Sequence, residues 1–125
     1  MKYKNILQID DDSEDCDLFF EALQTVSSAK YLAIHNAIDA LIKLEAGTII
    51  PDIIFLDLNM PKMNGAEFLY EIRKREILKY VPVIIFSTSP VSEMMLQTKD
   101  LGASDYITKP NSYNDLKTLL QTRVC

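Results

Sequence analysis

Residues 53–61 read Ile-Ile-Phe-Leu-Asp-Leu-Asn-Met-Pro, and their pattern is the strongest indication of the fold. Its first four residues form a short apolar run, mostly β-branched or aromatic, which predicts a buried β-strand. The proline that follows marks the end of the strand. Asp57 stands directly after the apolar run. Because an ionised carboxylate beside a buried strand costs free energy unless its charge is balanced, Asp57 is expected to have a metal, a cation or a chemical role.

Apolar runs alternate with runs of helical periodicity along the whole chain. Besides 53–56, the expected strands are residues 3–9, 31–34, 83–86 and 105–108. The expected helices are 13–26 with Ser13 as a cap, 37–46 closed by Gly47, one from Gly65 onward, one from Pro90 to Gly102, and one capped by Ser112. The pattern predicts an α/β fold, a doubly wound five-stranded parallel sheet of the flavodoxin-like (βα)5 type with strand order 2-1-3-4-5 and helices on both faces.

The spacing of apolar residues predicts which side of each helix faces the sheet. The residues expected to point inward are Leu18, Phe19, Ala22 and Val26, then Ile38, Leu41, Ile42 and Leu44, then Phe68, Leu69 and Ile72, and finally Tyr113, Leu116, Leu119 and Leu120. On the helix before Gly102, residues Val91, Met94, Met95, Thr98 and Leu101 share one face. Leu96 lies on the opposite face and is a candidate partner contact.

Composition narrows the class of protein. The chain has 125 residues, 48% of them apolar, which suits a single domain with its own core. Its 13 basic and 18 acidic residues give a net charge of −5, and the densest basic stretch, residues 73–75, is interpreted as a solvated helix end. Nucleic-acid binding is therefore not expected, because phosphate backbones demand concentrated positive charge.

Cysteine use and hydropathy bear on location. Cys16 and Cys125 lie in no CxxC motif and form no disulfide framework, so Cys16 is interpreted as an ordinary thiol and Cys125 as part of a frayed end. No apolar segment approaches the roughly 20 residues of a membrane span, and no signal peptide is apparent. We expect a cytoplasmic location and no membrane association.

Polar residues follow four of the five expected strands. They are Asp10-Asp11-Asp12 after the first strand, Asp57 after the third, Ser87-Thr88 at the fourth and Lys109-Pro110 after the fifth. The carboxyl ends of parallel strands share one edge of the sheet, so these side chains are expected to meet there. Clustered carboxylates repel one another, and a hard cation such as Mg²⁺ removes the repulsion. With the charge of Lys109 and the hydroxyl of Ser87, the cluster predicts that Asp57 accepts a phosphoryl group.

At these residues the chain resembles the receiver domain of two-component response regulators, over essentially all 125 residues. The most specific part is residues 55–65, Phe-Leu-Asp-Leu-Asn-Met-Pro-Lys-Met-Asn-Gly. The resemblance is to a stand-alone receiver, of the chemotaxis or phytochrome-associated kind, with no output domain. It implies the following roles: Asp57 as phosphoacceptor; Asp11, Asp57 and the backbone carbonyl of Asn59 as Mg²⁺ ligands, with Asp10 acting through water; Lys109 as the essential lysine; Ser87 and Tyr106 as switch residues.

The resemblance also implies a mechanism and partners. A sensor histidine kinase or a histidine phosphotransfer protein would donate the phosphoryl group, and the change would alter binding of a phospho-dependent protein target. Homodimer formation is compatible with this. No catalysis is implied beyond the protein's own phosphorylation and slow dephosphorylation. In typical family members the Lys109–Pro110 peptide bond is cis. Two flanking residues have open effects: Thr88 could narrow access to the phosphoryl group, and Asp12 could tune metal affinity or simply cap the helix.

Other classes of protein remain as alternatives. A small phosphatase with Asp57 as nucleophile would carry a DxD pattern, but position 59 is Asn. A flavodoxin-like cofactor module would need a first loop that binds phosphate. Residues 10–12 are three aspartates, which would repel a phosphate group. A non-phosphorylated interaction module would have no need of the complete polar set. His35, the one histidine, has no acid or nucleophile near it in sequence, so histidine-based catalysis is not expected.

Overall fold

The computed structural model describes residues 3–88 and 92–125, with only the backbone of residues 92–95. A five-stranded parallel sheet in the order β2-β1-β3-β4-β5 forms its centre, as predicted. The strands are β1 (Asn5–Ile9), β2 (Lys30–Ile34), β3 (Ile53–Leu56), β4 (Val83–Ser87) and β5 (Asp105–Thr108). The helices are α1 (Ser13–Val26), α2 (Ala37–Ala46), α3 (Gly65–Arg73), α4 (Ser92–Asp100) and α5 (Tyr113–Val124).

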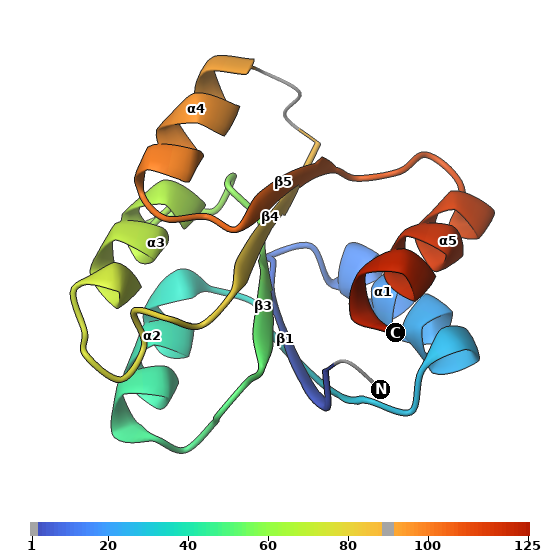
Figure 1. Cartoon of the computed structure of the whole chain (residues 1–125), viewed down its shortest axis with the longest axis horizontal. Coiled ribbons are helices and arrows are strands. Elements are labelled where there is room, and N and C mark those ends of the chain that lie inside the picture. The colour runs from blue at the N-terminus through green and yellow to red at the C-terminus, as the bar shows by residue number, and fades with distance from the viewer. Residues whose placement is uncertain (1–2, 89–91) are drawn as a thin grey trace.

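Helices cover both faces of the sheet. Figure 1 shows α1 and α5 on one side and α2, α3 and α4 on the other. The interior strands β3 and β4 are buried along their whole length, which explains why they read as continuous apolar runs and not as alternating ones. In the part of the chain that the structure describes, no helix is both long and apolar enough to span a membrane.

The core is divided by the sheet into two clusters. Ile53 and Phe55 of β3 face α1 and α5, whereas Ile54 and Leu56 face α2 and α3, as the alternation of side chains along a strand requires. Phe19 of α1 packs edge-on against Phe55, with ring centroids 5.0 Å apart. This packing fixes β3, and with it the position of Asp57 at its end.

The helix termini follow the expected chemistry with one difference. Ser112 caps α5 and Gly47 ends α2 with a left-handed φ of 75°, as predicted. At α1 the cap is Asp12 and not Ser13, because the Asp12 carboxylate accepts hydrogen bonds from the backbone N–H groups of Glu14 and Asp15. Ser13 is the first helical residue.

Two of the predicted inward helix faces, those of α1 and α2, are wrong in part, although Phe19, Ala22 and Leu44 are buried as predicted. Leu18, Ile38 and Ile42 are 48%, 40% and 61% exposed, so the prediction that they are buried is wrong. The buried residues of the two helices are Cys16, Phe19, Ala22 and Leu23 in α1 and Ala37, Ala40 and Leu44 in α2. Small residues bring α2 close to the sheet, so its larger isoleucines point away from it. In α5, Leu116 and Leu120 are buried as predicted, and Tyr113 and Leu119 are partly buried against the same cluster.

Part of the prediction for α4 lies outside the described residues. Pro90 and Val91 are not described, and neither are the side chains of Met94 and Met95. Of the remaining residues, Thr98 is fully buried, Leu101 packs against the core, and Leu96 is 67% exposed as predicted.

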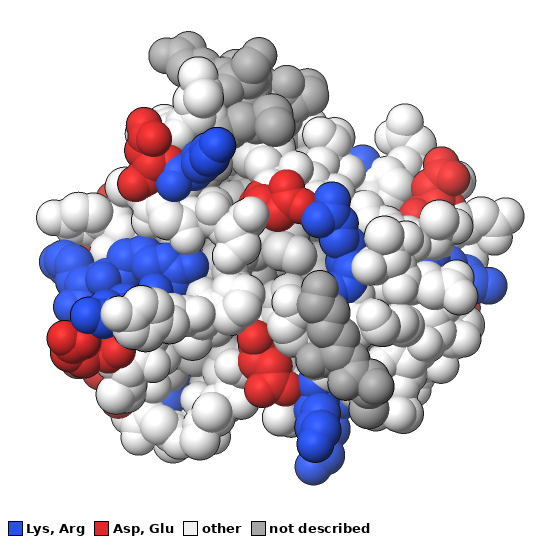
Figure 2. Space-filling view, viewed as in Figure 1, with Lys and Arg blue, Asp and Glu red and all other residues white. Residues whose placement is uncertain are grey.

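The basic stretch after α3 has a structural role that its sequence did not indicate. Arg73 donates two hydrogen bonds to the carbonyl of Gly102 and one to that of Leu78, so it ties the end of α3 to the end of α4. Arg75 is paired with Glu71 and Glu45. The stretch is a helix end, as predicted, and Lys74 is half exposed, but Arg73 and Arg75 also hold neighbouring elements together. On the face that Figure 2 shows, Lys and Arg side chains lie in separate groups, with acidic and uncharged side chains between them.

Candidate functional site

The predicted polar residues meet at the carboxyl edge of the sheet. Asp10 follows β1, Asp57 follows β3 and Ser87 ends β4; they are 1%, 6% and 0% exposed. The parallel register carries on past the strands, since the backbone N–H of Asp57 donates to the carbonyl of Ile9 at 2.9 Å. The backbone N–H of Lys109 donates to the carbonyl of Ser87 at 2.9 Å in the same way. The fold thus positions each side chain through its strand.

Three carboxylates form the centre of the site. Asp10, Asp11 and Asp57 each offer one oxygen, and these oxygens lie within 4.8 Å of one another. Burial raises the pKa of Asp57, and the negative charge of Asp10 raises it further, whereas Lys109 opposes the rise. Burial also raises the pKa of Asp10. Concentrated, partly buried negative charge with hard oxygen donors is the environment that a divalent cation of the Mg²⁺ type prefers, so the residues fit such an ion.

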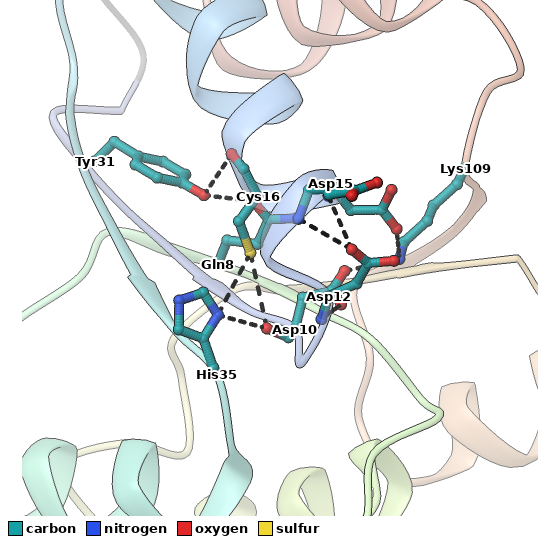
Figure 3. A network of polar contacts seen from close by, with 9 residues as sticks. Gln8, Asp10, Asp12, Asp15, Cys16, Tyr31, His35 and Lys109 are labelled. Atoms are coloured by element: carbon teal, nitrogen blue, oxygen red, sulfur yellow. Dashed lines mark hydrogen bonds and ion pairs between the residues drawn. The ribbon is translucent and has the colours of Figure 1, made fainter.

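Lys109 supplies the positive charge of the site. Its ammonium Nζ lies 2.7 Å from Oδ2 of Asp10 and 2.7 Å from Oδ2 of Asp15 (Figure 3). Burial favours the neutral amine, but the close contacts with these two carboxylates outweigh it and raise the pKa of Lys109, which stays charged. Asp15 was not predicted as a site residue. The available signal was an acid in the first turn of a helix that follows an acidic strand end.

The carboxylate of Asp57 has two further partners. It accepts hydrogen bonds from the hydroxyl of Ser87 and from the backbone N–H of Asn59. Tyr106 on β5 is partly buried and packs against the core cluster on the α2 and α3 side. Burial, and to a smaller extent the negative charge of Asp57, raises the pKa of Tyr106. Asp57 thus interacts with Ser87 through a hydrogen bond and with Tyr106 through its charge.

A second layer of polar contacts supports the backbone of Asp10. Nδ1 of His35 lies 3.1 Å from the carbonyl oxygen of Asp10, and the thiol of Cys16 lies 3.7 Å from it (Figure 3). The single hydroxyl proton of Tyr31 is shared between Oε1 of Gln8 at 2.6 Å and the carbonyl oxygen of Cys16 at 3.1 Å. Burial raises the pKa of Cys16 to about 12, so its thiol stays protonated and unreactive at neutral pH. His35 therefore contacts the main chain of the site and not its carboxylates.

The structure also describes three residues that flank the site, Asp12, Thr88 and Pro110. The carboxylate of Asp12 is engaged in capping α1, while its backbone N–H donates to Oδ1 of Asp10 at 2.9 Å. Thr88 is exposed next to Ser87. The described residues contain no cis peptide bond, so the Lys109–Pro110 bond, whose isomer the sequence left open, is trans here, unlike that of typical family members. The trans form is the intrinsically favoured one for a bond before proline.

Gly65 allows the β3–α3 loop to close over Asp57. A methyl group at Gly65 would collide with the carbonyl oxygen of Asp57 and lie 2.9 Å from Cα of Leu58. Because both neighbours are backbone, we expect Gly65→Ala to lower the free energy of unfolding by about 2–3 kcal/mol, as overpacking does. Urea unfolding measures this.

Gly47→Ala is the matched control for that measurement. A methyl group there meets nothing within 4 Å, and its only cost is the left-handed backbone, about 1 kcal/mol. Equal losses in the two variants would show that the contact between Gly65 and the Asp57 backbone does not matter.

Comparison with known proteins shows the family of this chain. The family model described as the response regulator receiver domain matches residues 6–121. The response regulator Rcp1 of Synechocystis sp. is 30% identical over 124 residues, which cover 94% of this chain and 84% of Rcp1. The crystal structure of the phosphorylated cyanobacterial phytochrome response regulator RcpA superposes with a TM-score of 0.87 at 31% identity, covering 96% of this chain and 90% of RcpA. The Mn²⁺-bound form of Rcp1 superposes with a TM-score of 0.85 at 30% identity, covering 95% and 90%.

Some relatives are much longer proteins. The sensor histidine kinase CheAY of Helicobacter pylori is 32% identical over 119 residues, which are 95% of this chain but 15% of the kinase. A protein-glutamate methylesterase/protein-glutamine glutaminase of Treponema denticola is 46% identical over 74 residues, 58% of this chain and 19% of that enzyme. The chain thus spans less than a fifth of these two relatives, and its likeness is to one part of each. From the family match, the fold and the acidic edge of the sheet, the chain belongs to the receiver domains of two-component response regulators.

Proposed function

We propose that this receiver domain is phosphorylated on Asp57 by a sensor histidine kinase or a histidine phosphotransfer protein and acts as a conformational switch. The observation that carries the proposal is the buried carboxylate of Asp57 at the end of β3. A second buried carboxylate, that of Asp10, lies in the same cluster and is paired with the Lys109 ammonium. Functional sites commonly hold ionisable groups in places that cost stability, and a chemical role accounts for such a carboxylate here.

The proposed reaction uses Asp57 as nucleophile. One carboxylate oxygen attacks the phosphorus of a phosphohistidine, so an O–P bond forms while the P–N bond breaks and its electron pair passes to the imidazole nitrogen. Catalysis of such a transfer is mainly positioning and neutralisation of charge. Lys109 would pair with a phosphoryl oxygen, and Ser87, whose hydroxyl already donates to Asp57, would donate to another.

We propose Mg²⁺ as the metal at this site. Asp10, Asp11 and Asp57 would hold it, with the backbone carbonyl of Asn59. When bound, Mg²⁺ supplies positive charge to the carboxylates and to phosphoryl oxygens. The Mn²⁺-bound form of Rcp1 supports a divalent ion in a similar protein, and the hard oxygen donors here favour Mg²⁺.

We propose that Ser87 and Tyr106 carry the signal to the surface. Ser87 would move toward the phosphoryl group, and Tyr106 would take the space that Ser87 leaves. Tyr106 also lines a groove of about 360 Å³ between α4 and β5. The other residues of this groove are Leu96, Thr98, Lys99, Ala103, Ser104 and Asp105. A shift of Tyr106 would therefore change the groove that a phospho-dependent protein target or a second copy could recognise.

Phosphorylation by a small donor tests the proposal directly. The protein is incubated with acetyl phosphate and Mg²⁺, and intact-mass spectrometry detects one added phosphoryl group, which hydroxylamine should remove because it is an acyl phosphate. The same protein is offered to a phosphorylated histidine kinase, and transfer is followed by loss of label from the kinase. Absence of labelling from both donors would overturn the proposal.

Leu96 tests the proposed output surface. Its side chain is 67% exposed on α4 beside the groove, so Leu96→Asp should leave the stability unchanged and raise the Kd of the phosphorylated protein for its target about tenfold. Ile42→Asp is the control, since Ile42 is 61% exposed on α2, which does not line the groove. Equal affinities of the wild type and Leu96→Asp would exclude Leu96 from the interface.

A further inference from the structure

The Lys109 ammonium is shared between two carboxylates on different elements. Nζ lies 2.7 Å from Oδ2 of Asp10, which follows β1, and 2.7 Å from Oδ2 of Asp15, in the first turn of α1. Within residues 3–88 and 92–125, no ion pair of 4.0 Å or less joins Lys109 to Asp57. In this state the ammonium is therefore directed to the acids of β1 and α1, and its effect on Asp57 is a longer-range one.

The two contacts of Lys109 differ in the free energy that is needed to break them. The side chain of Asp10 is 1% exposed, so separating it from Lys109 would leave a buried, uncompensated charge. The side chain of Asp15 is 35% exposed, so water can replace Lys109 there at small cost. An ammonium group has three N–H donors, and a phosphoryl group adds a dianion with three acceptor oxygens. When such a group competes for Lys109, the contact to Asp15 is the one that breaks most easily.

We propose that Asp15 is a positioning residue that competes with the phosphoryl group on Asp57 for Lys109, and so favours the unphosphorylated state. This inference rests on the proposed phosphorylation of Asp57. The contact to Asp15 stabilises the protein before phosphorylation and is given up afterwards, so it sets the population of the activated state for a given donor. Sequence separation hides the pair, because Asp15 and Lys109 are 94 residues apart.

Helix α1 offers a matched control for charge alone. Glu14 is exposed in the same helical turn and carries the same charge, so it interacts with the helix N-terminus as Asp15 does. Its carboxylate forms no ion pair with Lys109, whose paired carboxylates are those of Asp10 and Asp15. Glu14→Gln and Asp15→Asn thus remove equal charge, but only the second releases Lys109.

Beryllofluoride binding measures this competition without chemistry. With Mg²⁺ in excess, BeF₃⁻ mimics a phosphoryl group on an aspartate, and its Kd is obtained from backbone amide NMR shifts. We expect Asp15→Asn to bind BeF₃⁻ about two- to fivefold more tightly than the wild type, the range for a partly exposed ion pair. Glu14→Gln should bind as the wild type does, and Asp15→Glu, which restores the carboxylate, should reverse most of the gain.

The side-chain ammonium resonance of Lys109 supplies a second readout. It should shift on BeF₃⁻ binding in the wild type, and Asp15→Asn alone should already move it part of the way, whereas Glu14→Gln should not. Absence of BeF₃⁻ binding to the wild type would overturn the proposed function and this inference with it. Binding to the wild type with equal or weaker binding to Asp15→Asn would overturn the inference alone. Equal gains in Asp15→Asn and Glu14→Gln would also overturn it, because charge and not contact would be the cause.

Discussion

Asp57→Asn is expected to abolish phosphorylation by both acetyl phosphate and a phosphohistidine donor. The amide has nearly the same shape as the carboxylate and can still accept hydrogen bonds from Ser87 and from the Asn59 backbone. It lacks the anionic oxygen that attacks phosphorus, so geometry is kept while the nucleophile is lost. Intact-mass spectrometry after incubation with Mg²⁺ and the donor measures the labelled fraction, which should fall from near completion to the background.

Asp17→Asn is the control for this loss. Asp17 is an exposed aspartate of α1 whose carboxylate is outside the three-carboxylate cluster, and its replacement should leave labelling unchanged. Far-ultraviolet circular dichroism of both variants should match the wild type. Full phosphorylation of Asp57→Asn would show that the acceptor is another residue, and peptide mapping of the labelled protein would then identify it.

The position of Asp57 could be predicted because it depends on backbone topology. A short apolar run followed by an acid and a proline indicates a strand end, and parallel strands place all their carboxyl ends on one edge. Asp10, Ser87 and Lys109 were predicted for the same reason, since each follows or ends its own strand. None of these predictions needs the orientation of a helix or the reach of a long side chain.

The features that the sequence did not predict depend on the orientation of a helix or on the reach of a long side chain. The rotation of a helix about its axis is set by packing against the sheet, so small Ala37 and Ala40 face inward while Ile42 is exposed. Apolar spacing alone favours the opposite choice, although exposed apolar residues are common. The pairing of Lys109 with Asp15 depends on how far a flexible side chain extends, and no spacing rule relates residues that are so distant in sequence.

Mg²⁺ is expected to raise the free energy of unfolding of the wild type. Without metal, folding brings Asp10, Asp11 and Asp57 together and buries two of them, which opposes folding when they are ionised. A cation that binds the folded cluster and not the unfolded chain adds about 2.7 kcal/mol at a concentration 100 times its Kd. Urea unfolding with Mg²⁺ or with EDTA measures the difference. Asp57→Asn should be more stable than the wild type in EDTA, by about 1–2 kcal/mol, and should gain much less from Mg²⁺.

The pH dependence of the metal-free protein follows from the same carboxylates. Burial raises the pKa of Asp57 and of Asp10 above 3.8, so between that value and the raised pKa values the folded state binds more protons than the unfolded state. In that window the contribution of this pair to stability falls as pH rises and grows as pH falls. In EDTA, lowering the pH from about 7 into this window should therefore stabilise the wild type more than Asp57→Asn. Bound Mg²⁺ favours the ionised carboxylates, so in its presence the trend should reverse, because protons then compete with the metal. An identical pH dependence of the two proteins in EDTA would mean that Asp57 titrates as it does in the unfolded chain, and that its charge has no cost for the metal ion to relieve.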